Sequence, residues 1–185
     1  MGFGPRFADF DNDGINDIIS GSYTGGLSFF KGLGESRYAA MKKITQKDGK
    51  PVSKGYAQTP CMGDWDGDGD YDMALGVISG PVKLYLNNGD LTFTEAGDFT
   101  VNGKPITASD GGPCVVDWDG DGVLDLLLGD GQGSVDFYPG TGRGARELRA
   151  KETIIKADAN GGWQPRKPSK NPAMPFTPAQ PGVRT

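Results

Sequence analysis

Apolar and polar residues alternate along most of the chain in short segments that are separated by glycine-rich turns. A period of two, with β-branched and aromatic residues enriched, is typical of half-buried β-strands. The pattern occurs in three similar units, and in each unit it predicts three strands in the same order. The first strand is expected at 5–8, 59–63 and 112–116, the second at 17–21, 72–76 and 125–129, and the third at 26–30, 80–86 and 133–138.

A fourth strand is expected in each unit, at 38–45, 91–101 and 148–155. The first two units also share a turn sequence, Asp48-Gly-Lys-Pro-Val52 and Asn102-Gly-Lys-Pro-Ile106, and both Asp-Gly and Asn-Gly favour tight hairpin turns.

Four antiparallel strands in a unit of about 50 residues are typical of β-propeller blades. We therefore predict an all-β fold of three four-stranded antiparallel blades, at residues 1–56, 57–110 and 111–156. Residues 157–185 contain a proline every few positions and no apolar period, which indicates an extended tail, a linker or an insertion between blades.

The same nine-residue acidic cassette lies between the first and second strand of every unit. Its copies begin at Asp9, Asp64 and Asp117, so the unit repeats after 55 and then 53 residues. Carboxylates at cassette positions 1, 3, 5 and 9 come from alternate residues of a tight turn, and they repel one another unless a cation lies among them. Calcium takes six to eight oxygen ligands in flexible geometry, and glycine at position 6 permits the turn.

We therefore predict about three calcium ions per chain, one at each cassette. Three ions would move the net charge from −5 to +1, so the acidity reflects the cassettes and does not indicate a basic partner. The expected carboxylate ligands are Asp9, Asp11, Asp13 and Asp17 in the first cassette, Asp64, Asp66, Asp68 and Asp72 in the second, and Asp117, Asp119, Asp121 and Asp125 in the third.

The motif Asp-x-Asp-x-Asp-Gly-x-x-Asp between two strands of a repeat resembles the FG-GAP/VCBS repeat family, whose relatives include the integrin α-subunit propeller. The resemblance covers about residues 3–156, although the Phe-Gly and Gly-Ala-Pro signature is only partly present. It implies calcium binding, with the backbone carbonyl at position 7 as a further ligand, and this carry-over falls on Ile15, Asp70 and Val123. It also implies work outside the cell or at the cell surface. The interpretation we favour is a calcium-stabilised module for binding or adhesion that is not an enzyme.

Other calcium motifs fit the cassettes less well. An EF-hand needs an acidic residue at loop position 12 and helices on both sides. This chain has Ser20, Leu75 and Leu128 at position 12, within predicted strands. Nonapeptide calcium repeats would occur far more often than every 50 residues.

Three blades are fewer than the four to eight that usually close a propeller. An open arc exposes apolar blade faces at both ends. We therefore expect either a fragment of a longer propeller or self-association of chains to complete the ring. No apolar run approaches the roughly 20 residues of a membrane span, and the first residues lack the apolar core of a signal peptide.

The composition argues against catalysis. The chain has no histidine, and therefore lacks the usual general base and the usual zinc ligand. Arg143 to Lys170 is basic but lacks the interleaved aromatics and compact patch of a nucleic-acid site. The predicted partner is a protein or polysaccharide. Two alternatives stay open: part of a calcium-dependent carbohydrate-active enzyme such as a polysaccharide lyase, and a purely structural repeat of a large surface protein.

Two residue pairs recur at equivalent positions in the second and third units. Trp65 and Trp118 occupy cassette position 2, where we expect an aromatic ring to pack beside the loop; a sugar-stacking platform is the alternative. Cys61 and Cys114 each lie three residues before a cassette and are expected to be small buried thiols. Whether they form a disulfide depends on geometry that the sequence does not contain.

Overall fold

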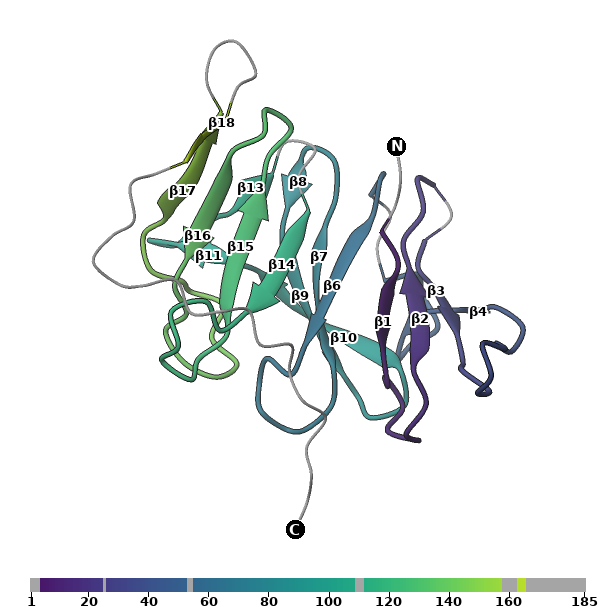
Figure 1. The fold of residues 1–185 in the computed structure, drawn as a ribbon. Coiled ribbons are helices and arrows are strands. Elements are labelled where there is room, and N and C mark those ends of the chain that lie inside the picture. The colour runs from purple at the N-terminus through teal and green to yellow at the C-terminus, as the bar shows by residue number, and fades with distance from the viewer. Residues whose placement is uncertain (1–3, 25, 53–54, 109–111, 158–162, 166–185) are drawn as a thin grey trace.

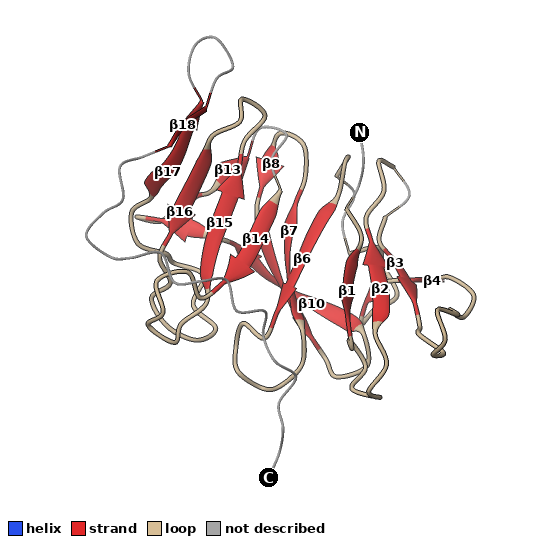
Figure 2. Cartoon of the chain, viewed as in Figure 1, coloured by secondary structure: helices blue, strands red, loops and turns tan. Residues whose placement is uncertain are grey.

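The computed structural model describes residues 4–24, 26–52, 55–108, 112–157 and 163–165. Within these ranges every element of regular secondary structure is a strand (Figure 2), which confirms the all-β prediction. The sheets stand beside one another in an open arc that follows the chain from its N-terminus (Figure 1). No helix among the described residues has the length and apolar character needed to cross a membrane.

Each predicted unit forms a sheet in which consecutive strands are antiparallel neighbours. The first sheet contains β1 (Arg6–Ala8), β2 (Asp17–Ser20), β3 (Ser28–Phe30) and β4 (Lys42–Lys43). The second contains β6 (Thr59–Gly63), β7 (Asp72–Gly76), β9 (Lys83–Asn87) and β10 (Thr92–Asp98). The third contains β14 (Pro113–Val116), β15 (Asp125–Gly129), β16 (Val135–Tyr138) and β17 (Glu152–Ala157).

The second and third sheets each gain a fifth strand. The short strand β5 (Thr45–Gln46) lies in the first predicted unit but pairs in parallel with β10 of the second sheet. Strand β18 (Trp163–Pro165), from the proline-rich tail, pairs with β17 at the edge of the third sheet. An edge strand tolerates proline because one side of its backbone needs no partner. Residues 158–162 and 166–185 of the tail lie outside the described residues.

Two small pairings complete the strand inventory. Strand β8 (Gly80–Pro81) pairs with β13 (Thr107–Ala108), and β11 (Thr100–Val101) pairs with β12 (Lys104–Pro105). Asn102 and Gly103 form the two-residue turn between β11 and β12, with φ angles of 50° and 70°. Positive φ at both central residues is the geometry that Asn-Gly favours in a hairpin, so this predicted turn is confirmed.

The hydrophobic core lies between the blades in two clusters. The first cluster joins Phe10 and Ile19 of the first blade to Met73 and Tyr85 of the second. The second joins side chains of the second and third blades, among them Trp65, Leu84, Leu126 and Leu148. Each blade therefore buries its apolar face only by packing against a neighbour.

The aromatic residue at cassette position 2 packs toward the next blade. The ring centroid of Phe10 lies 5.4 Å from that of Tyr71, edge to face, and Trp65 Nε1 donates to the Ala145 carbonyl at 3.0 Å. Both side chains are buried, as the packing interpretation expected. Trp118, which no described blade follows, is 51% exposed.

The two cysteines lie on the neighbouring strands β6 and β14. The Val115 backbone N–H donates to Cys61 Sγ at 3.2 Å. Cys61 is buried as expected, but the expectation was wrong for Cys114, whose side chain is exposed; both thiols are free.

The glycine at the end of the second strand lies at the contact between blades, so replacing it tests how closely the blades pack. A Cβ on Gly21 would lie 1.8 Å from the Gln58 carbonyl oxygen of the second blade, whereas a Cβ on the equivalent Gly129 would meet nothing within 4 Å. We expect Gly21→Ala to lower the free energy of unfolding by about 2 kcal/mol, because a backbone atom must move. Gly129→Ala, the matched control, should change it little. Urea denaturation measures both, and equal effects would contradict this packing.

Candidate metal centre

The last aspartate of every cassette is buried at the start of the second strand. Asp17, Asp72 and Asp125 are 0%, 1% and 0% exposed. In each case one carboxylate oxygen accepts a hydrogen bond from the backbone N–H at cassette position 2, and the other from the N–H fifteen residues further on. The distances are 3.0 and 2.7 Å for Asp17, 2.9 and 2.9 Å for Asp72, and 2.8 and 2.8 Å for Asp125.

This arrangement, which we call the carboxylate clamp, fixes the start of the cassette to the end of the third strand. Burial raises the pKa of Asp72 to about 6, although the hydrogen bond from the Asn87 backbone opposes the shift. Burial also raises the pKa of Asp17 and Asp125. The ionised clamp is therefore costly unless a cation compensates its charge.

Backbone N–H groups also orient the other aspartates of the turn. Asp9 at position 1 accepts from the N–H of position 5 at 2.9 Å and of position 6 at 2.8 Å. Asp64 accepts from the N–H of position 4 at 2.8 Å, and Asp117 accepts from positions 4 and 6 at 2.8 and 3.0 Å. At position 5, Asp13, Asp68 and Asp121 each accept the N–H of position 7 at 2.9 Å. The glycine at position 6 has a φ between 83° and 97° in all three copies, as Gly14, Gly69 and Gly122 show.

Three carboxylates converge in every cassette, with oxygens within 4.8 Å of one another. Hard oxygen donors of this kind, held by backbone N–H groups, fit calcium. The first cassette unites positions 1, 3 and 5, whereas the other two unite positions 1, 3 and 9. The groups are Asp9, Asp11 and Asp13; Asp64, Asp66 and Asp72; and Asp117, Asp119 and Asp125.

The other predicted ligands lie outside these groups. Asp17 is part of the clamp but not of the first group, and Asp68 and Asp121 orient the turn through position 7. The Asp70 carboxylate accepts from Asn12 Nδ2 of the first cassette at 3.4 Å, so it points toward the neighbouring blade. The ligand roles of the carbonyls of Ile15, Asp70 and Val123 remain predictions.

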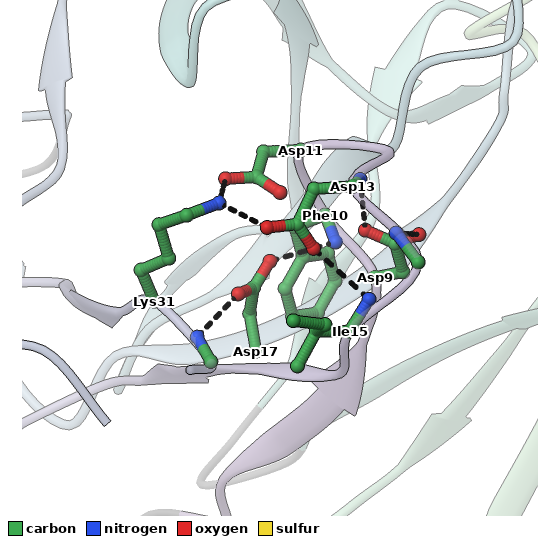
Figure 3. A network of polar contacts seen from close by, with 9 residues as sticks. Asp9, Phe10, Asp11, Asp13, Ile15, Asp17 and Lys31 are labelled. Carbon is green, nitrogen blue, oxygen red and sulfur yellow. Dashed lines mark hydrogen bonds and ion pairs between the residues drawn. The ribbon is translucent and has the colours of Figure 1, made fainter. Parts of the chain in front are cut away.

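Lys31 is the residue that sequence reasoning missed. Its ammonium donates to Asp11 and, at 2.6 Å, to Asp13 Oδ2 (Figure 3). These contacts raise the pKa of Lys31 and lower that of Asp13. Aligning the third strands of the three units could have singled out Lys31, because Leu86 and Pro139 occupy the equivalent positions of the other units.

A cavity of about 320 Å³ lies beside the first cassette, between the first and second blades. Lys31, Lys42, Asp70 and Asp90 contribute charged groups to its wall, and Thr92 a hydroxyl. The cavity therefore presents both hydrogen-bond donors and acceptors.

The clamp predicts how stability depends on pH without calcium. The folded pKa of Asp72 lies above its unfolded value of about 3.9, so the native state binds more protons in between and becomes more stable as pH falls. From pH 7 to pH 5 in a chelator, the free energy of unfolding of the wild type should rise by about 1 kcal/mol more than that of Asp72→Asn. Urea titrations of both proteins measure this difference. The same pH response in both would argue against a buried ionised clamp.

The FG-GAP-like repeat profile matches residues 9–75 and again 64–128, while no curated protein matches the sequence. A lectin from Agrocybe aegerita, solved for its specific recognition of non-reducing terminal N-acetylglucosamine, shares the fold over 81% of this chain, with 23% identity and a TM-score of 0.52. The chain spans 37% of that lectin chain. Because the profile matches cover well over half of the sequence, the chain belongs to the FG-GAP-like repeat family.

Proposed function

We propose that the chain is a calcium-stabilised β-propeller module that binds a carbohydrate or protein ligand outside the cell and catalyses no reaction. The observation that carries this proposal is the threefold carboxylate clamp with three aspartates converging beside it. The same geometry in every blade, at the turn between its first two strands, fits a structural ion better than a single reactive centre.

Calcium bound at the cassettes would neutralise their carboxylates and tie the turn to the strands on both sides. The converging aspartates at positions 1 and 3 would hold the ion in every blade, joined by position 5 or position 9. Outside the cell, where the proposed module would act, millimolar calcium would keep sites of modest affinity occupied.

Calcium titration tests this proposal. Calorimetry should detect up to three ions per chain, and calcium at about 100 times its dissociation constant should stabilise the fold by about 2.7 kcal/mol per site. Asp119→Ala should remove one site, whereas Asp48→Asn, on an exposed turn outside the cassettes, should keep all of them. Neither binding heat nor a thermal shift with calcium would refute the proposal.

A carbohydrate is the first ligand to test. Support comes from the fold shared with a lectin that recognises terminal N-acetylglucosamine and from the polar cavity between the first two blades. Glycans ending in N-acetylglucosamine should be retained on an array, and Lys42→Ala should weaken them severalfold while Lys104→Ala, on β12, does not. Unsaturated product from uronic-acid polysaccharides would instead favour the lyase alternative, and a blank array and pull-down would favour a structural repeat.

The two end faces of the arc support self-association. Phe7 is 60% exposed, whereas its equivalents Met62 and Val115 pack against the clusters between blades. At the opposite end of the arc, Trp118 is exposed, whereas the equivalent Trp65 of the second blade is buried. A second copy could therefore place its Phe7 face on the Trp118 face and extend the ring. Light scattering in calcium should then give twice the 19.5 kDa of one chain, and Trp118→Ser should abolish the dimer.

A further inference from the structure

The first cassette carries its own cation. The Lys31 ammonium lies between the carboxylates of Asp11 and Asp13 and forms an ion pair with each (Figure 3). All three side chains are only partly exposed, with Lys31 at 35%. The position between two carboxylates that converge with Asp9 is where a metal ion would bind.

The strand register shows that this lysine is specific to the first blade. Ile18 pairs with Phe30, so Lys31 lies opposite the clamp residue Asp17. The same register places Leu86 opposite Asp72 and Pro139 opposite Asp125. Among the described residues, the aspartates of the second and third cassettes take part in no ion pair.

The converging carboxylates of the first cassette also differ from those of the other two cassettes. Asp13 joins Asp9 and Asp11 there, and the buried clamp residue Asp17 is not part of the group. In the other two cassettes the clamp residue itself belongs to the group. The cassette that pairs with the lysine is thus also the one whose converging carboxylates include position 5 instead of position 9.

We propose that Lys31 competes with calcium for the first cassette, so that this site binds the ion at least about tenfold more weakly than the other two and the sites fill in two steps. This inference rests on the proposed calcium binding. Calcium must displace two charge-assisted hydrogen bonds, and the displaced ammonium remains nearby and repels the ion. The ion pairs are partly solvated, which limits the loss of calcium affinity to a factor of roughly tens rather than thousands.

Filling the first site would also change the cavity between the first two blades. Lys31 lines this cavity together with Asp70 and Asp90. When calcium occupies the cassette, the ammonium is free to face those carboxylates instead of Asp11 and Asp13. The calcium concentration then sets which charges a ligand in this cavity meets.

Lys31→Met tests the competition, because methionine keeps an unbranched side chain that is one atom shorter and removes the charge. Calorimetric titration of the wild type should show two tight sites and a third that is weak or undetectable. The variant should show three sites of similar affinity, with the third tightened at least about tenfold and a larger thermal shift at low calcium. Lys42→Met, which removes a charge from the same cavity wall, should retain the two-step titration.

Lys31→Gln provides a second variant that keeps a polar side chain, and it should tighten the third site as well. Three equal sites in the wild type, or an unchanged weak step in both Lys31 variants, would overturn the inference and leave calcium binding intact. Absence of calcium binding in every protein would overturn both this inference and the proposed function. Circular dichroism in a chelator establishes that each variant is folded.

Discussion

A buried carboxylate that accepts two backbone hydrogen bonds is the interaction on which every blade depends. Asp17, Asp72 and Asp125 each connect the beginning of an acidic turn, the second strand and the end of the third strand. Two N–H groups satisfy its oxygens but do not neutralise its charge, and nearby aspartates add more negative charge. The hydrogen bonds therefore fix the geometry of the blade but leave its negative charge uncompensated, which is the reason for the proposed cation.

Packing between blades supplies the second constraint. Among the described residues, both core clusters lie between neighbouring sheets, so each blade shares its hydrophobic core with the next one. The side chains that fill these clusters are exposed where the neighbour is absent, as Trp118 shows. Stability in such an array comes from each blade together with its contacts to the adjacent ones.

Much of the fold and the convergence of aspartates at the candidate metal centre could be predicted because the information is local and occurs three times. Alternation located the strands, and the cassette located the turns that hold the converging aspartates. What escaped depends on contacts between distant segments: the pairing of β5 with β10, the addition of β18, the exposure of Cys114 and the placement of the Lys31 ammonium. A lysine after a strand has no local signature, because its partners lie across a turn some twenty residues earlier.

The parallel pairing of β5 with β10 has a consequence for how such a chain can evolve. Thr45 and Gln46 belong to one sequence repeat but complete the outer edge of the next sheet. The unit that a gene would duplicate and the unit that folds are therefore out of phase by one strand. Deleting the first repeat as the sequence defines it would also remove β5 and leave the edge of β10 unpaired, which favours aggregation, so a deletion that keeps the second sheet intact has to end before Thr45.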